Sequence, residues 1–299
     1  MQFIRNGSFN QKKLRLTLLL GATSQQGFDD KGNNTVIVEG LRVSAQIRNG
    51  GGIIAPTTQI VVYGLSAEIM NQVARIKWNT EETKMNFIRL EALHNGAYTL
   101  VFEGMISFAY PNFGASSESM LTIQAVTAIQ HQIQAAPPVS IKGEVDVAKL
   151  IEQICQNIGM DFENNGVTTK ISNPYLCETG LEQIKKLCQA ADINLAIEAR
   201  KVAISNKTKG RNIKIPVISP NTGLIGYPVP NLSGITFQCL FDPMIRFHGI
   251  VQIKDSLISV ANGMWLIYGL TYHLESEVAN GKWCIDVSAT YIGEVKVAK

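Results

Sequence analysis

The sequence predicts a mainly β protein with an α+β insert, in which two similar β-barrels flank a small helix-containing module. Three observations lead to this prediction. The first and last thirds of the chain alternate apolar and polar residues with the period of two that is typical of strands. The middle part carries apolar residues at helical spacing. A pattern of turn, apolar strand, glycine and closing strand also occurs once in the first third and again in the last.

An alternating strand is predicted near the start of the chain, where leucine occupies every second position from 14 to 20. Lys12 and Lys13 precede this stretch, as basic residues do in a signal peptide. Arg15 interrupts it, however, and it is short for the apolar core of a leader. We therefore expect a strand, and synthesis in a reducing cytoplasm.

The rest of the first third has the pattern of strands joined by turns. Ser66 is placed to cap a short helix, and Asn95-Gly96 between two alternating segments is a strong signal for a hairpin. Further on, Pro137 and Pro138 indicate a linker. The expected strands are residues 41–47, 59–63, 87–92, 98–106 and 120–126.

The middle part predicts two helices and a hairpin. Asp146 is placed to cap the first helix, and Thr179 with Glu182 forms a capping box that opens the second. The hairpin turns about residues 199–201. The predicted domains are residues 1–135 for the first barrel, 136–212 for the α+β insert and 213–299 for the second barrel.

The last third returns to strands, and part of it repeats the first third. The segment from Gly104 to Ala125 matches the segment from Gly269 to Ala289, and each ends in an alternating strand. The match is short, but it predicts a duplicated barrel. The expected strands are residues 234–240, 250–253, 264–268, 270–274 and 283–291.

Composition excludes several classes of protein. Of the 299 residues, 45% are hydrophobic and only 17% are charged, with a mean hydropathy of +0.08. No apolar run approaches the roughly 20 residues that span a bilayer, so we expect no stable membrane insertion. We interpret the scarcity of charge as surface hidden against other subunits. The net charge of +3 is evenly spread, which predicts no sequence-specific nucleic-acid binding.

No arrangement typical of catalysis is present, so we expect no enzyme activity, catalytic residue, cofactor or metal. The five cysteines are odd in number and form no CxxC motif, and the four histidines are scattered. Glu91 and Glu103 near one hairpin leave open the carboxylate pair of a glycoside hydrolase, although strand alternation favours outward solvated glutamates. Trp265 and Trp283 leave open a sugar-stacking platform, although packing across strands accounts for both.

One segment is specific enough to indicate a family. Residues 223–228 read Gly-Leu-Ile-Gly-Tyr-Pro, and residues 239–253 read Cys-Leu-Phe-Asp-Pro and onward. This resembles the baseplate hub proteins of phage tails, in which a GLIGxP loop precedes a strand ending in a CLLNPxIxxGxxVxI pattern. Residues 57–66 are similar to the family's strand ending in IYNLS. The motif residues expected to matter for the structure are Gly226, Tyr227, Pro228, Cys239, Asp242, Pro243, Gly249, Tyr63, Leu65 and Ser66.

Two departures from the family pattern are compatible with turns. Asp242 and Gly64 stand where the family usually has asparagine, and both residue types are common in turns. Gly249 falls between apolar residues, where it predicts a turn or bulge that requires a small residue.

The resemblance implies a structural baseplate hub protein of a bacteriophage tail. In the family, a homotrimer forms a pseudo-sixfold ring that joins the tail tube protein to the central spike protein and lets DNA pass. The resemblance also implies contact with the tape-measure protein, a place in the virion baseplate, and assembly in the cytoplasm of the host bacterium. The loops at 49–52 and 111–118 are expected at interfaces. Two alternatives stay open: a tail-associated cell-wall hydrolase, and the hub part of a type VI-like secretion spike.

Overall fold

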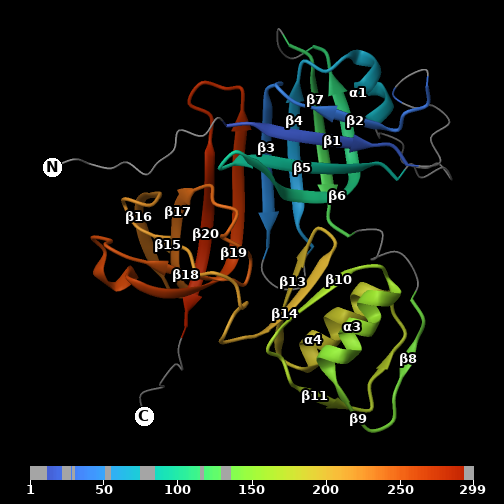
Figure 1. Cartoon of the computed structure of the whole chain (residues 1–299), viewed down its shortest axis with the longest axis vertical. Helices are drawn as coiled ribbons and strands as arrows, with labels where there is room; N and C mark the ends of the chain where they lie inside the picture. The colour runs from blue at the N-terminus through green and yellow to red at the C-terminus, as the bar shows by residue number, and fades with distance from the viewer. Residues whose placement is uncertain are drawn as a thin grey trace.

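The computed structural model describes residues 12–21, 28, 31–50, 55–74, 85–114, 118–128 and 136–292. It confirms the predicted class, because the chain is mainly β with large antiparallel sheets and has three α-helices in the described part. We call the described residues up to 128 the first half, residues 136–212 the insert and residues 213–292 the second half. In Figure 1 the insert lies below the first half, and the second half lies beside them. No described helix is long and apolar enough to cross a membrane.

The first half contains seven described strands and one helix. Its first strand forms as predicted, with alternate leucines buried in the core. Ser66 caps the helix, since its hydroxyl accepts a hydrogen bond from the backbone N–H of Ile69 at 3.3 Å. Asn95, with φ +49°, forms the predicted hairpin turn. The elements are β1 (Leu14–Leu19), β2 (Thr35–Val38), β3 (Val43–Asn49), β4 (Thr57–Tyr63), α1 (Ala67–Val73), β5 (Phe87–His94), β6 (Ala97–Asn112) and β7 (Met120–Val126).

Strand β6 belongs to two layers of the first half. Its residues up to Met105 pair with β5, and its residues from Met105 onward pair with β7. A bulge between Ile106 and Phe108 accompanies this change of partner. As a result, β1 and β5 run across β3, β4 and β7, as Figure 1 shows. The first half is therefore a barrel-like pair of crossed layers.

The insert folds around its own core. Asp146 caps its first helix as predicted, because its side chain accepts a hydrogen bond from the backbone N–H of Lys149 at 3.0 Å. The predicted capping box is wrong in detail. Thr179 stands at the N-cap but makes no capping hydrogen bond, and Glu182 binds Lys185 instead. The elements are β8 (Val139–Ser140), β9 (Glu144–Asp146), α3 (Val147–Asn157), β10 (Asp161–Asn165), β11 (Lys170–Ser172), β12 (Tyr175–Leu176), α4 (Gly180–Ala190), β13 (Ile193–Glu198) and β14 (Lys201–Asn206).

The second half has three strands at their predicted positions, and its other strands differ from expectation. Residues 224–228, expected as part of a loop, belong to strand β16, which pairs with β17 and bulges between Ile225 and Val229. Gly226 in this bulge has φ +69°, a conformation that favours glycine. The two strands expected at 264–274 form one long strand. The elements are β15 (Val217–Ile218), β16 (Leu224–Asn231), β17 (Gly234–Leu240), β18 (Ile250–Ile253), the short 3-10 helix η1 (Ser259–Ala261), β19 (Gly263–Ser276) and β20 (Trp283–Tyr291).

The two halves share one 13-stranded sheet. Its order is β16-β17-β20-β19-β3-β4-β7-β6-β5-β1-β2, with β15 and β18 attached beside β19. Strand β19 joins the halves, because its residues 263–266 pair with β18 and its residues 270–276 pair with β3. The strands expected in two barrels are thus continuous through the β19–β3 pairing.

The strand order of the first half recurs in the second. The series β16-β17-β20-β19 is followed in the sheet by β3-β4-β7-β6, and the two series have the same chain order. In each series the long strand that comes third in chain order, β6 or β19, forms a bulged antiparallel pair with the strand that comes last in chain order, β7 or β20. This topology supports the predicted duplication.

The residue match proposed for the repeat is wrong in its detail. Ile106 pairs with Ala125 just before the bulge of β6, and Ile267 pairs with Ala289 just before the bulge of β19. The two isoleucines therefore correspond, whereas Gly104 and Gly269 do not. The predicted match of Ala125 with Ala289 is confirmed, since each pairs with one of these isoleucines.

Two hydrophobic cores hold the described chain together. One core extends through both halves, and the other lies in the insert. Cys155 and Cys188 lie in the core of the insert, and burial raises the pKa of each thiol to about 12. Ala196 and Ala203 of the insert belong to the first core instead. One face of the β13–β14 hairpin therefore packs against the two halves.

Candidate functional site

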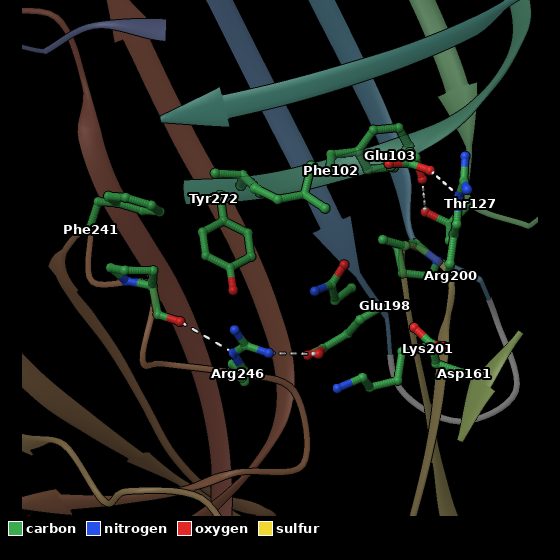
Figure 2. Close-up of a pocket in the computed structure, with 16 residues that line it drawn as sticks. Phe102, Glu103, Thr127, Asp161, Glu198, Arg200, Lys201, Phe241, Arg246 and Tyr272 are labelled. Atoms are coloured by element: carbon green, nitrogen blue, oxygen red, sulfur yellow. Dashed lines mark hydrogen bonds and ion pairs between the residues drawn. The ribbon is translucent and has the colours of Figure 1, made fainter. Parts of the chain in front are cut away.

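A cavity of about 310 Å³ lies where the insert meets both halves. Figure 2 shows its lining side chains. The first half supplies residues 100–103 of β6 and the ends of β3 and β4, the insert supplies its 198–201 turn, and the second half supplies Phe241, Arg246 and Tyr272. All three parts of the chain thus contribute to its walls.

Ion pairs hold the insert's turn to both halves at this cavity. The Nε of Arg200 lies 2.7 Å from Oε1 of Glu103 on β6. On the other side, Nη1 of Arg246 lies 3.4 Å from Oε2 of Glu198, at the end of β13. The hydroxyl of Tyr272 is buried and donates a hydrogen bond to the carbonyl of Ile245 at 2.9 Å. The charged groups named here bind one another, so they hold the three parts of the chain together around the cavity.

A buried arginine near the end of the insert binds two carboxylates of the insert and also contacts the second half. The backbone N–H of Arg211 donates to the carbonyl of His248 at 2.8 Å, and its Nη1 donates to the carbonyl of Phe247 at 3.5 Å. The side chain of Arg211 is only 1% exposed. Its Nε and Nη2 donate to the two carboxylate oxygens of Glu163 at 3.0 and 3.1 Å, and its Nη1 donates to Glu198 at 2.7 Å. Two-point pairing of this kind is the strongest arrangement of a guanidinium with a carboxylate. Glu163 and Glu198 lie on β10 and β13 of the insert.

The environment of this link shifts two pKa values. Burial would raise the pKa of Glu163, but hydrogen bonds from Arg211 and Asn165 and the charges of Arg211 and Lys201 lower it to about 2. Burial and the charge of Arg211 lower the pKa of His248 to about 4, against a hydrogen bond with the backbone of Leu195. At neutral pH the link therefore contains an ionised glutamate and an uncharged histidine.

The residues considered for catalysis are held in other contacts. Glu103 binds Arg200, and Glu91 lies 3.6 Å from Arg89 and 3.9 Å from Arg15. In the described part of the chain, no group of three or more His, Cys, Asp or Glu side chains is placed to hold a metal ion.

The two tryptophans considered for sugar binding pack in aromatic pairs. The Trp265 ring packs edge-on against Tyr291, and the Trp283 ring packs edge-on against Phe241. Trp265 also donates a hydrogen bond from Nε1 to the carbonyl of Ala261 at 2.8 Å.

The motif residues of the second half lie in three successive pieces of structure. Gly226, Tyr227 and Pro228 form the bulge of β16, where the tyrosine is 60% exposed and the proline is buried. Cys239 is fully buried in β17. Asp242 then stabilises a turn, because its Oδ1 accepts a hydrogen bond from the backbone N–H of Met244 at 2.8 Å.

The remaining motif residues form turns as well. Pro243 lines the cavity, and a Cβ on Gly249 would lie 2.9 Å from the carbonyl oxygen of Arg246. In the first half, the guanidinium of Arg42 lies over the ring of Tyr63 at the end of β4, while Leu65 is buried and Ser66 caps α1. Strands β4 and β16 are separated in the sheet by four others, so the structure does not bring the two sets of motif residues into one site.

Two outer strand edges of the repeated series are unpaired in the described structure. In the described part of the chain, strand β16 pairs only with β17, and residues 108–112 of β6 pair only with β7. Residues 51–52 and 115–117 of the loops expected at interfaces lie outside the described residues. The exposed large apolar residues on or beside these two edges are Tyr110, Phe113, Ile225, Tyr227, Val229, Leu232, Leu257 and Val260.

Sequence reasoning missed the arginine link. Arg211 lies in the polar stretch Lys-Gly-Arg-Asn, and its partners Glu163 and Glu198 are 48 and 13 residues away. A helical or strand period points to apolar faces and gives no signal for a buried charge. The ion pairs of Arg211 can therefore be recognised only from the structure, in which β10 and β13 lie next to residue 211.

Comparison with protein families gives a match over most of the chain. The family described as baseplate hub gp41 matches residues 23–281. The chain belongs to the baseplate hub gp41 family. The hub is therefore a component of a phage tail, and its family is structural. A comparison with curated proteins gave no significant match.

Solved structures share the fold of the hub. A prophage MuSo2 tail protein from Shewanella oneidensis has a TM-score of 0.59 at 10% identity, over 92% of the hub and 96% of that chain. A tail protein from Neisseria meningitidis has a TM-score of 0.59 at 9% identity, over 93% and 96%. The Escherichia coli c3393 protein, a component of the type VI secretion system, has a TM-score of 0.56 at 11% identity, over 85% and 74%. The mainly β tail-protein fold is thus shared at very low identity.

Proposed function

We propose that three copies of the hub form a closed ring in the baseplate, which joins the tail tube to the central spike and lets DNA pass. The observation that supports this proposal most directly is the repeated strand series. Each chain carries two equivalent units in line, so three copies would place six units around one axis. The units are those of the predicted domains 1–135 and 213–299, with 136–212 inserted between them.

The β19–β3 pairing within one chain suggests how strands of two neighbouring copies could pair. Inside one chain, β19 of the second half pairs with β3 of the first. The repeat makes β6 equivalent to β19 and β16 equivalent to β3. Among the described residues, β16 and residues 108–112 of β6 have a free edge, so β16 of one copy fits beside β6 of the next. Such head-to-tail contacts generate a closed ring when the rotation between copies closes.

The register of the joint between copies follows from the pairings within the chain. His273 lies opposite Gln46 in the β19–β3 joint. Asn112 corresponds to His273 and Val229 corresponds to Gln46, because their partners in the neighbouring strands match. We therefore expect Asn112 of one copy to lie opposite Val229 of its neighbour.

Side chains on the two edges favour contact between copies. Val229 and Tyr227 are each 60% exposed on β16, and Phe113 is 55% exposed after β6. Burying such side chains contributes about 25 cal/mol for each Å² of apolar surface removed from water. Pro228 and Pro230 lower the number of backbone hydrogen bonds that β16 can donate. The apolar side chains would therefore supply most of the binding energy.

The other partners follow from membership of a baseplate hub family. Loops at the two ends of the ring would bind the tail tube protein and the central spike protein, and the tape-measure protein would pass through the lumen. Assembly would take place in the host cytoplasm, consistent with five free cysteines. The alternative of a cell-wall hydrolase gains no support from Glu91 and Glu103, since arginines bind both. The likeness to a type VI component shows a shared fold and does not separate the two settings.

Mass measurement of the purified hub, alone and with its spike protein, tests the ring. Light scattering and native mass spectrometry should give three copies per particle. A hub that stays monomeric at every concentration and is absent from purified tail particles would overturn the proposal.

Cross-linking tests the register. A Cys177→Ser background removes the one cysteine that is exposed in the structure. Chains with Asn112→Cys are mixed with chains with Val229→Cys and oxidised, since facing strand residues lie within disulfide distance. A mixed disulfide dimer is expected, whereas Asn112→Cys mixed with Gln153→Cys should give none. Equal yields from both mixtures would contradict the register.

A further inference from the structure

A groove lies between the insert and the outer layer of the first half. Its volume is about 500 Å³, which falls within the range of about 300–1,000 Å³ for binding pockets. Strands β1, β2, β5 and β6 of the first half supply one wall, and Gly159, Ala199 and Arg200 of the insert supply another. We call this space the insert groove. One chain forms it completely, so it requires no second copy.

An apolar row of side chains runs along the wall that the first half supplies. Leu19 pairs with Phe87, and Phe87 pairs with Met105, and paired residues of neighbouring strands lie on the same face of a sheet. The opposite face of these strands is turned to the core, because the preceding and following residues Leu18 and Ile88 belong to it. Met105 is buried, yet it belongs to neither hydrophobic core. The row therefore lines the groove and is not part of the core.

The rest of this outer face is charged. Arg89 and Glu103 lie opposite each other in the next row, and beyond them Arg15 forms ion pairs with Glu39 and Glu91. The solvent face of an antiparallel sheet is commonly polar throughout. The apolar row is thus an exception, and it is confined to the side of the face that adjoins the insert.

The insert covers the apolar row only in part. Met105 is 5% exposed, whereas Leu19 is 37% exposed. Ile37 on β2 is 64% exposed, and it pairs with Thr17 of the groove wall, so it extends the apolar surface outward. Exposed apolar surface of this kind, with polar residues around it, is typical of a place where another molecule binds.

The charge that the insert groove presents to another molecule is positive. The side chains of Arg89 and Arg200 are 49% and 79% exposed, whereas those of their partners Glu91 and Glu103 are 15% and 20% exposed. Arg200 donates to Glu103 through Nε, and its two Nη groups carry further N–H donors that suit a carboxylate. An approaching molecule therefore meets guanidinium groups before it meets carboxylates.

We propose that the insert groove binds a segment of another protein in which apolar side chains stand next to acidic ones. The apolar side chains would cover Leu19 and Phe87, and the carboxylates would pair with Arg89 and Arg200. Charge-assisted pairing of this kind favours acidic segments over basic ones. Because the insert and the first half both line the groove, a bound segment would also hold these two parts together.

Selection from random peptides of about a dozen residues, displayed on yeast, tests this inference. The full-length hub is the target, and the enriched peptides are sequenced and synthesised. We expect them to combine Leu, Ile or Phe with Asp or Glu, and to bind less tightly as salt rises. Enrichment of basic peptides, or no enrichment over the starting library, would overturn the inference.

Two groove variants locate the binding of the enriched peptides. Leu19→Asp places a carboxylate in the apolar row and should weaken binding roughly tenfold or more. Arg200→Gln removes an exposed charge and should weaken binding roughly threefold or more, with a smaller dependence on salt. Because Arg200 is 79% exposed, its variant keeps the test decisive even if Leu19→Asp does not fold. Unchanged affinity in the folded groove variants would overturn the inference.

Two matched variants elsewhere on the insert serve as controls. Tyr175 is 69% exposed, and Lys170 is 63% exposed and pairs with Glu144 as Arg200 pairs with Glu103. Tyr175→Asp and Lys170→Gln should both leave peptide binding unchanged, and urea denaturation checks that every variant is folded.

Light scattering of the hub alone separates another protein from a second copy as the occupant. If Leu19→Asp reduces self-association of the hub, a second copy occupies the groove and the inference is wrong. Peptide binding is measured on the chain whether or not it assembles. A hub that never forms rings would therefore overturn the proposed function and leave this inference standing.

Discussion

The two halves of the hub have the same strand series but differ in what covers its first strand. In the first half, β3 pairs with β4 on one side and with β19 on the other. In the second half, β16 pairs with β17 alone, and its exposed side chains include Tyr227 and Val229. Among the described residues, the first strand of the series therefore has two neighbouring strands in the first half and only one in the second half. This difference is what points to another copy of the chain beside β16.

The largest expected effect comes from charging each of these two strands. Ile47 on β3 is 1% exposed, so Ile47→Asp should lower the free energy of unfolding by about 4 kcal/mol or more. Val229 on β16 is 60% exposed, so Val229→Asp should change it by less than about 0.5 kcal/mol while preventing assembly of the proposed trimer. Urea denaturation and light scattering measure the two quantities. Equal destabilisation by both changes would remove the distinction between the covered and the free edge.

A second comparison concerns a buried and an exposed arginine of the insert. Arg211→Met leaves Glu163 and Glu198 without their buried partner within the insert and should lower the free energy of unfolding by about 3–5 kcal/mol. Arg200 is 79% exposed and pairs with Glu103 of the first half, so the matched change Arg200→Met should cost less than about 1 kcal/mol. Denaturant titration measures both losses. Similar losses would contradict the argument that burial makes the Arg211 pairs the stronger ones.

The turn before β18 gives a smaller expected effect. A Cβ at Gly249 would lie 2.9 Å from the carbonyl oxygen of Arg246 and 3.0 Å from Cδ1 of Ile213. Gly249→Val should therefore lower stability by about 2 kcal/mol and reduce assembly. Gly114 in the first half has nothing within 4 Å of its Cβ position, so Gly114→Val is the control. Thermal melts of the two variants should differ clearly, and unchanged melting of the Gly249 variant would refute the steric argument.

The smallest expected effect is a pH dependence located at the link to the second half. The pKa of His248 is about 4 in the fold against 6.5 normally, so the unfolded chain binds a proton first as pH falls. Stability should decline between pH 6.5 and 4 for this reason. Because the pKa of Glu163 is about 2, its contribution is full above pH 4.5 and is lost toward pH 2.

His248→Asn, which tolerates the φ of +57° at this position, isolates the histidine effect. Stability measured by urea denaturation at several pH values should fall less steeply for this variant between pH 6.5 and 4. An identical slope in both proteins would exclude His248 as the cause.

Signals within a few residues predicted most helices and strands well. Pairings between strands that are far apart in the sequence could not be predicted in this way. Alternating leucines gave β1, Asn95-Gly96 gave the β5–β6 turn and Asp146 gave the start of α3, because each signal acts within a few residues. The capping box was the exception, since the buried Thr179 hydroxyl makes no hydrogen bond and the Glu182 side chain binds Lys185.

Local signals could not predict the short strands or the β3–β19 pairing between the halves. Strand β10 pairs in parallel with β14, and β3 pairs with β19, so neither partner is near in sequence. The candidate surfaces depend on such pairings. The contact between the two halves forms only once Gln46 and His273 lie opposite each other, and the buried position of Arg211 depends on two strands of the insert.

The β3–β19 joint also determines when the sheet can be completed. Ser44 on β3 and Glu275 on β19 are 231 residues apart. The ribosome must therefore have synthesised β19 before β3 gains its second neighbour, and long-range pairings of this kind form slowly. In the proposed ring, the folded chain keeps one such open edge, β16, for a second copy. Pro228 and Pro230 lie on this edge, where they oppose pairing with unrelated strands. During synthesis β3 is likewise an open edge, at which unrelated strands can pair until β19 arrives.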